Sequence, residues 1–405
     1  MTPETRRHLP RAERLTLVLG VAALGVAFVL GWISPRAIPA AWRLAVFACL
    51  QPALGSLIFI LIFRLTGGRW MQGLAPFLTA GARLLPWIWL LALPLLWFPA
   101  AAAPEADRTP APTATDHELP GPNSTAFAAP TRPASDTLEH AFAAEPSRHF
   151  DAGLRTYFSR PAVVLRAIVY ALAFFLLAAG ATRVMRTLPT DTMRWFGPLG
   201  LIGLVFLLHL LATDWFVLLD PGWYSTGFPL VWIAGQALAG LAAAIALALL
   251  LGASPAQPTA DGKRPRGLDW GNLLLAAVMS WTYVAFVQWL IIWSGNLPAE
   301  TAWYRHRSHG VWLWLAVALA ALEFAAPFAL LLSRAVKRSR TLLASVAALL
   351  FAGQLGYTVW LIAPAVAPDG AAAAWLMTST GIAALALFLN RYLVGARKLA
   401  ASLAA

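Results

Sequence analysis

Charged residues are scarce in this sequence: they make up 12% of its 405 residues, which is about half the share found in a soluble domain. Whole stretches lack them, including residues 15–34, 168–182 and 311–322. A soluble helical protein would show amphipathic stripes instead. A helix of about 20 apolar residues, with every backbone group bonded inside it, can cross the hydrocarbon of a bilayer. The missing charge therefore excludes an ordinary soluble domain and predicts an all-α integral membrane protein.

Cysteine is almost absent, and acidic residues are outnumbered by basic ones. The single Cys49 lies in an apolar segment, which excludes a disulfide framework within the chain and a Cys-ligated cluster or zinc site of its own. The net charge of +12 is of a size that can indicate nucleic-acid binding. The Lys and Arg residues, however, stand in short clusters between apolar blocks, as expected of loops held at an anionic inner leaflet. We therefore expect the lipid bilayer as a partner, and no nucleic acid.

Apolar blocks of about 20 residues predict about ten transmembrane helices. Residues 1–99 hold the first three, 160–252 the next three and 270–405 the last four, while 253–269 form a cytoplasmic linker. Residues 100–159 are rich in Ala, Pro, Thr and Asp, which predicts a largely disordered extracytoplasmic loop. The expected spans are 15–34, 43–64, 83–99, 160–182, 195–218, 227–252, 270–293, 311–333, 341–363 and 374–396.

The distribution of Lys and Arg predicts the orientation, because cytoplasmic loops carry more of them. The N-terminus, the segments after the second, fourth, sixth and eighth spans, and the C-terminus hold twenty. The segments after the first, fifth, seventh and ninth spans hold four. We therefore expect both termini in the cytoplasm. The first apolar run resembles a signal peptide in its basic start, but it exceeds the usual length of about 7–15 apolar residues in a cleaved one.

Four ionisable residues lie inside the predicted spans, where such groups are costly and commonly functional. Arg166 lies in the fourth span, His209 and Asp214 in the fifth, and Glu323 near the middle of the eighth. One interpretation is a proton path from Glu323 through His209 to Asp214, since a buried carboxyl and an imidazole can exchange protons at neutral pH. The alternative is structural: an Arg166–Asp214 ion pair joins two helices. His209 and Glu323 are then hydrogen-bonded packing groups.

Two predicted outer loops have similar sequences, which suggests an internal duplication. Each leaves its span at an Asp-Trp or Gln-Trp pair, turns at a proline and continues with Trp-Tyr. An aromatic belt at the membrane interface would explain these rings without any partner. Docking to a partner subunit or to a lipid-soluble ring compound would explain them too. The candidates for such an interface are Asp220, Trp223, Tyr224, Gln288, Trp293, Asn296, Glu300 and Trp303.

These loops resemble signature segments of the ActF-type membrane subunit of bacterial alternative complex III, in the polysulfide-reductase NrfD-like superfamily. The likeness is carried by Asp214-Trp215 through Pro221, by Trp223-Tyr224-Ser225-Thr226, and by Gln288 through Pro298. The segment Pro327-Phe328 with Leu331-Leu332-Ser333-Arg334 resembles the family's next helix. Weaker likeness extends over most of the chain outside its long loop.

The resemblance implies two NrfD-like four-helix bundles with flanking helices, in a respiratory quinol:cytochrome c oxidoreductase of the bacterial inner membrane. The implied partners are a homologous NrfD-like membrane subunit, an iron–sulfur subunit and multihaem cytochrome c subunits, which hold the haem c and the iron–sulfur clusters. This chain would have no catalytic residue, metal or cofactor of its own. It would support assembly, with quinol binding or proton conduction as further roles. The family commonly has a His where this chain has Glu323, and an Asp where it has Gly356.

Two other functions stay open at this point. The chain could be a purely structural scaffold, in which case its buried ionisable groups serve stability alone. It could also be a secondary transporter for a small solute, which requires a midplane cavity and broken helices. The sequence shows no clear pair of Gly or Pro interruptions that would provide them.

Overall fold

The computed structural model describes residues 3–71, 73–96, 157, 159–185, 195–217, 225–258, 264–366 and 371–402. Within this part the chain consists of helices and their connections, with one isolated bridge between Pro258 and Pro265. Ten helical segments there are long and apolar enough to cross a membrane. Each of them overlaps one predicted span, so the prediction of an all-α multi-span membrane protein is confirmed.

Contacts divide the chain into two units. The first unit consists of Met1–Ala101 together with Tyr170–Ala405, and the second unit is Ala102–Val169. The helix α7 begins in the second unit and ends in the first. The predicted loop 100–159 lies almost wholly outside the described residues. The α-helices are α1 (Pro3–Ile33), α2 (Ile38–Thr66), α3 (Ala75–Ala82), α4 (Leu85–Ala92), α7 (Arg160–Val184), α8 (Phe196–Val217), α9 (Phe228–Leu250), α10 (Arg266–Gly295), α11 (Pro298–Arg307), α12 (Gly310–Leu319), α13 (Ala326–Leu332), α14 (Arg334–Arg338), α15 (Arg340–Val366) and α16 (Ala371–Ser402).

Two of the ten spans are interrupted. The third consists of α3, α4 and the short 3-10 turn η3 (Leu93–Leu96), and it begins at Ala75, eight residues before the predicted start. Arg83 therefore lies within this span, at the end of α3, and not in the inner loop where the charge count placed it. The eighth span consists of α12, the π turn η6 (Ala320–Ala325) and α13. Without Arg83, the inner segments still hold many more Lys and Arg residues than the outer segments, so the predicted orientation does not change.

The centre of the first unit is a close contact between α2 and α9. A side chain at Gly55 would collide with the carbonyl oxygen of Gln236 and with the backbone of Gly240. Small residues let two membrane helices approach this closely, so that their backbones gain van der Waals contact. Each helix also carries a glutamine four residues before its glycine, Gln51 on α2 and Gln236 on α9. Both glutamines are buried.

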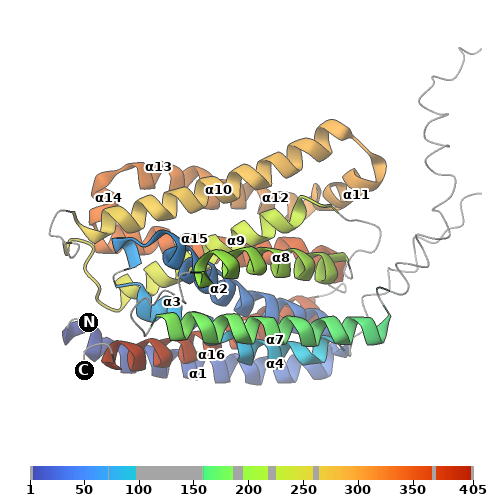
Figure 1. Ribbon diagram of the computed structural model, residues 1–405. Coiled ribbons are helices and arrows are strands. Elements are labelled where there is room, and N and C mark those ends of the chain that lie inside the picture. Colours follow the sequence, from blue (N-terminus) through green and yellow to red (C-terminus); the bar gives the residue numbers. More distant parts are fainter. Residues whose placement is uncertain are drawn as a thin grey trace, which may run out of the picture. The chain divides into compact units, whose positions relative to one another are not determined.

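Other helices pack around this pair. α15 and α10 lie against α9, while α8, α3 and α16 lie against α2. α1 packs along α16 at one side of the unit, and Figure 1 shows the N- and C-termini at the same end of this helix pair. Only 11% of the apolar window of α1 is buried, so most of its surface faces lipid. The placement of both termini in the cytoplasm stays a prediction.

Candidate functional site

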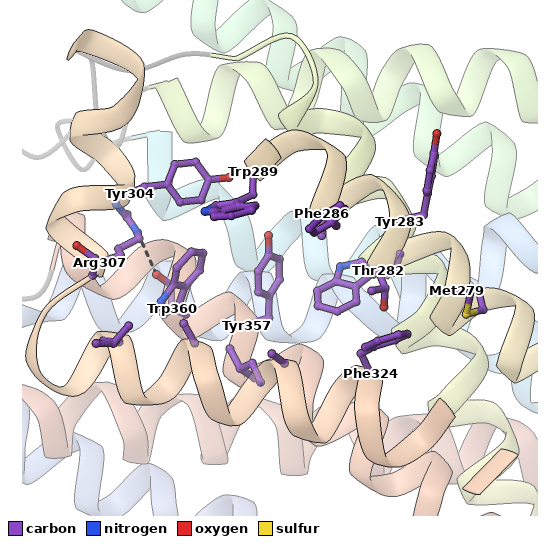
Figure 2. A pocket seen from close by; sticks show the side chains of 17 residues that line it. Met279, Thr282, Tyr283, Phe286, Trp289, Tyr304, Arg307, Phe324, Tyr357 and Trp360 are labelled. Atoms are coloured by element: carbon purple, nitrogen blue, oxygen red, sulfur yellow. Dashed lines mark hydrogen bonds between the residues drawn. The ribbon is translucent and has the colours of Figure 1, made fainter. Parts of the chain in front are cut away.

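A cavity of about 740 Å³ lies between α10, α11, α12, η6 and α15. Ligand pockets commonly measure about 300–1,000 Å³ and are mostly apolar, with a few polar groups that orient the ligand. Figure 2 shows aromatic side chains from several of these helices around the cavity. It is lined by Met279, Trp281, Thr282, Tyr283, Ala285, Phe286, Trp289, Tyr304, Arg307, Ser308, Leu313, Ala316, Leu319, Ala320, Phe324, Tyr357 and Trp360.

The inner wall of the cavity is built from aromatic rings of α10 and α15. Trp281 meets Tyr357 edge-on with ring centroids 5.2 Å apart, and Tyr357 stacks on Trp360 at 5.8 Å. Tyr357 and Trp360 are three residues apart, so both rings project from one face of α15. In Figure 2 the hydroxyl of Tyr357 points into the cavity, on the side of Trp289. The wall therefore offers flat apolar surfaces with a hydroxyl among them.

One side of the cavity faces outward from the protein. Tyr283, Phe286 and Met279 line it and are nevertheless 67%, 55% and 44% exposed. All three lie on α10, inside a membrane span. Their exposed surface therefore lies on the outside of this chain, within a membrane span. An apolar molecule dissolved in the bilayer can enter the cavity from this side.

The opposite end of the cavity is closed by α11, which brings Tyr304 and Arg307. Burial raises the pKa of Tyr304, against the opposing effect of the Arg307 charge. The phenol is therefore neutral at physiological pH, and its hydroxyl can donate a hydrogen bond. Arg307 is only 3% exposed, and its guanidinium carbon lies 3.7 Å from the centroid of the Trp303 ring.

Arg307 also holds the end of α15 in place. Its Nε donates to the carbonyl of Trp360 at 3.2 Å (Figure 2). Its Nη2 donates to the carbonyl of Leu361 at 2.9 Å. Nη1 donates to the carbonyl of Trp303 at 3.0 Å. Pro364 lies inside α15 and has no N–H for the Trp360 carbonyl four residues earlier. Arg307 thus bonds a carbonyl that the proline leaves free, and this fixes α11 over the cavity.

Beside the cavity, the π turn η6 buries Glu323 completely, at 0% exposure. Pro327 lacks the N–H that an α-helix would use to bond the carbonyl of Glu323, and the helix widens just before it. Single π turns inside helices are frequent at functional sites. The Glu323 side chain packs directly on α15, where a Cβ at Gly353 would lie 2.5 Å from Glu323 Cγ.

The carboxyl of Glu323 is connected to α2 through side chains of α15. Gln354 Nε2 donates to Glu323 Oε2 at 2.6 Å. The backbone carbonyl of Gln354 accepts bonds from Gln51 Nε2 at 2.9 Å and from Thr358 Oγ1 at 3.2 Å. Gln51 Nε2 also donates to the Thr358 hydroxyl oxygen. All four side chains are buried, so this is a polar seam through the middle of the helix bundle.

The predicted proton path placed Glu323, His209 and Asp214 in sequence. The structure gives the two acids partners on different helices: Glu323 bonds Gln354 on α15, whereas Asp214, 4% exposed, accepts a 2.7 Å bond from Tyr170 on α7. His209 is half-buried on α8. The path through these three residues stays a prediction.

In the second unit, Arg166 donates from Nη1 to the carbonyl of Tyr157 at 2.6 Å, with its guanidinium carbon 3.7 Å from the centroid of that ring. The predicted ion pair between Arg166 and Asp214 stays a prediction, because these residues belong to different units.

The predicted interface residues divide into three groups: those outside the described residues, those that are buried, and the remaining three, Trp293, Asn296 and Glu300. Asp220, Trp223 and Tyr224 lie outside the described residues. Gln288 and Trp303 are buried at 7% and 5%. Trp293, 64% exposed, stacks on Trp289 with centroids 5.8 Å apart and extends the aromatic surface of α10 beyond the cavity. Asn296 ends α10 in the left-handed conformation, and Glu300 lies in the first turn of α11.

The buried residues of this group pack within the chain. Gln288 Nε2 donates to Ser225 Oγ at 2.6 Å, which ties α10 to the start of α9. Trp303 packs against Trp360 with centroids 5.3 Å apart. Neither is placed to contact a partner, so their part in an interface stays a prediction that the burial does not favour.

Sequence reasoning named none of Tyr304, Arg307, Gln51, Thr358 and Tyr357 as a candidate site residue, although Trp303-Tyr304 and Arg307 continue the family resemblance of the second loop. One further signal was available: Arg305 and Arg307 are the two Lys or Arg residues between the seventh and eighth predicted spans, on the side where such residues are rare. Neither a scan against protein-family models nor a search of curated proteins found a match for this chain.

Proposed function

We propose that this chain is a membrane subunit of a respiratory quinol:cytochrome c oxidoreductase of the alternative complex III type. It would lie in the bacterial inner membrane with both termini in the cytoplasm. The observation that carries the proposal is the lipid-facing aromatic cavity beside a buried carboxyl. The sequence resemblance supplies the type of complex.

A quinol fits the chemistry of this cavity. The wall of Trp281, Tyr357 and Trp360 suits a flat ring, because aromatic rings favour stacked and edge-on contacts. The hydroxyls of Tyr357 and Tyr304 can bond ring oxygens, and an isoprenoid tail can leave through the lipid-facing side of α10. A transported polar solute would need more polar groups than these. The π turn in the eighth span and the break in the third are features that transporters share, but the apolar lining favours a lipid-soluble ligand.

In this function Glu323 accepts a proton from the quinol. Oxidation of a quinol to a quinone releases two protons and two electrons, and the electrons pass to iron–sulfur clusters and haem c in partner subunits. The chain itself then binds and orients the ring and takes up one of the two protons. A positioned general base typically contributes about 10²–10⁴-fold to a rate.

The cavity is tested by filling it. Ala316 of α12 lines the cavity, whereas Ala318 on the same helix is exposed and does not line it. Quinone binding to the purified chain in lipid nanodiscs is measured by quenching of tryptophan fluorescence. We expect Ala316→Phe to weaken binding about tenfold or more, the effect of losing about 1.4 kcal/mol. Ala318→Phe should bind like the unchanged chain. Equal binding by both variants would remove the cavity from the proposal.

The role of Glu323 is tested by Glu323→Gln in the assembled complex. A glutamine oxygen can still accept the bond from Gln354, so assembly and haem content should be unchanged. Quinol:cytochrome c turnover should fall by about 10²-fold or more. If turnover is unchanged while assembly holds, Glu323 has no part in the chemistry. If assembly fails and the cavity binds no quinone, the chain is a structural scaffold.

A further inference from the structure

Glu323 does not itself line the cavity, although its neighbours in η6 do. Ala320 and Phe324 are lining residues, whereas the carboxyl between them is turned inward and is 0% exposed. A proton released in the cavity therefore has no direct contact with the carboxyl. The route between the two has to be built from other groups.

Several buried polar atoms near Glu323 have no hydrogen-bond partner within the described part of the chain. Buried polar groups are bonded in the great majority of cases, and an ordered water is the usual partner when no protein group is. One of these atoms is the second carboxyl oxygen, Glu323 Oε1. Two belong to the cavity wall, Trp281 Nε1 and Thr282 Oγ1, and two to the central helix pair, Gln51 Oε1 and Gln236 Oε1.

Donors and acceptors alternate from the cavity wall to the carboxyl. Trp281 belongs to the wall, and both its Nε1 and Gln354 Oε1 face Gly235 of α9. A Cβ at Gly235 would lie 3.4 Å from Trp281 Nε1 and 2.7 Å from Gln354 Oε1. The other end of the same Gln354 amide donates to Glu323. The glycine thus leaves an indole N–H and an amide oxygen without an intervening side chain, and the amide continues to the carboxyl through its NH₂ group.

We propose that water molecules bound to Trp281 Nε1, Gln354 Oε1 and Glu323 Oε1 connect the cavity with Glu323 and carry protons between them. The indole and the amide orient the waters and keep their own protons. A proton leaves a donor in the cavity for the first water, each water passes one proton onward, and Glu323 Oε1 accepts the last. Trp281, Gln354 and Gly235 are therefore positioning residues. The assignment of the donor as a quinol rests on the proposed function, but the route does not.

The route is tested without any quinol. The full chain in nanodiscs is subjected to a pH jump, and the infrared band of the Glu323 carboxyl is followed in time, assigned as the band that Glu323→Gln removes. Gly235→Ala places a methyl group between Trp281 Nε1 and Gln354 Oε1. Trp281→Phe keeps an aromatic ring and removes the N–H. Both should slow proton equilibration of Glu323 by about tenfold or more.

The matched control is Gly203→Ala, since a Cβ at this helical glycine of α8 meets nothing within 4 Å. It should leave the rate unchanged. If Gly235→Ala fails to fold, Trp281→Phe decides alone. Rates within twofold of the unchanged chain in both variants would overturn the route. If both variants slow proton equilibration but the chain binds no quinone, the route holds and the proposed function is refuted. If the chain binds quinone but neither variant changes the rate, the proposed function holds and the route is refuted.

Discussion

The contact of Arg307 with α15 makes a prediction whose size follows from the structure. Pro364 leaves the Trp360 carbonyl without its helical N–H, and Arg307 donates to it and to the carbonyl of Leu361. Hydrogen bonds to charged groups each contribute about 1.5–3 kcal/mol. Arg307→Met removes these bonds and leaves buried carbonyls without that donor, which costs about 1–3 kcal/mol for each unsatisfied group. We therefore expect Arg307→Met to lower the free energy of unfolding by about 3 kcal/mol.

Removing the proline should make Arg307 less important. In Pro364→Ala the new N–H bonds the Trp360 carbonyl, so one of the bonds that Arg307 makes becomes redundant. Arg307→Met should then cost about 1 kcal/mol less in this background than in the unchanged chain, the value of one hydrogen bond. The assay is a double-mutant cycle on the chain in detergent or bicelles, with unfolding followed by circular dichroism and by trapping of the unfolded form.

The coupling energy between Arg307→Met and Pro364→Ala decides whether Arg307 replaces the missing N–H. Independent sites add to within about 0.3–0.5 kcal/mol. A coupling energy inside that range would show that Arg307 does not replace the missing N–H. A coupling of about 1 kcal/mol in the stated direction supports it. Backbone hydrogen exchange at the end of α15 should also rise in Arg307→Met and return toward normal in the double variant.

Two further predictions concern packing and pH. Gly55→Ala should destabilise the chain by about 3 kcal/mol or more, because its methyl group collides with the backbone of α9, whereas Gly25→Ala, which meets nothing within 4 Å, should be neutral in the same unfolding assay. Burial, and secondly the charge of Arg334, lower the pKa of Lys337, whose Nζ donates to Asn272 Oδ1. Folding then favours the neutral amine, so stability should rise with pH in the alkaline range just below the ordinary lysine pKa of about 10.4. Lys337→Met should remove this rise, and an identical pH profile in both proteins would contradict it.

The membrane spans could be predicted from the sequence because hydrophobicity over 20 residues is a strong and local signal. The error at the third span has a local cause as well. Arg83 breaks the apolar run, so the hydrophobic block seemed to begin there, but the segment Ala75–Ala82 before it is also helical. A charge at the junction of two short helices is compatible with one span when its side chain can reach a polar surface.

The site was predicted only in part, because it depends on contacts between distant residues. Glu323 could be found from its type and depth alone. The rest of the polar seam could not: Gln51 and Thr358, which are hydrogen-bonded, are 307 residues apart in sequence, and a glutamine in an apolar helix has no pattern of its own. Likewise Pro364 predicts a free carbonyl, but nothing local indicates that Arg307 bonds it.

Several buried polar contacts nevertheless share a feature that the sequence contains, which is a glycine on the neighbouring segment. A polar side chain inside a membrane has to reach a partner group, and a helix is easiest to approach where it has no side chain. Five buried polar residues in the described part of the chain follow that rule, because each packs where a Cβ on the neighbouring segment would collide with it. The pairs are Glu323 with Gly353, Gln354 with Gly235, Gln288 with Gly227, Lys337 with Gly271, and Ser56 with Gly81.

The consequence is that these glycines belong to the polar network as much as its donors and acceptors do. Gly353→Ala would force Glu323 off α15 without changing any polar atom, since the new methyl group would lie 2.5 Å from Glu323 Cγ and 2.8 Å from Oε1. The carboxyl would then lose its 2.6 Å bond from Gln354 and face an apolar surface, a change that costs about 1–3 kcal/mol for the unsatisfied group alone. The position of the acid in the bundle is therefore set by the shape of α15 first and by its hydrogen bond second.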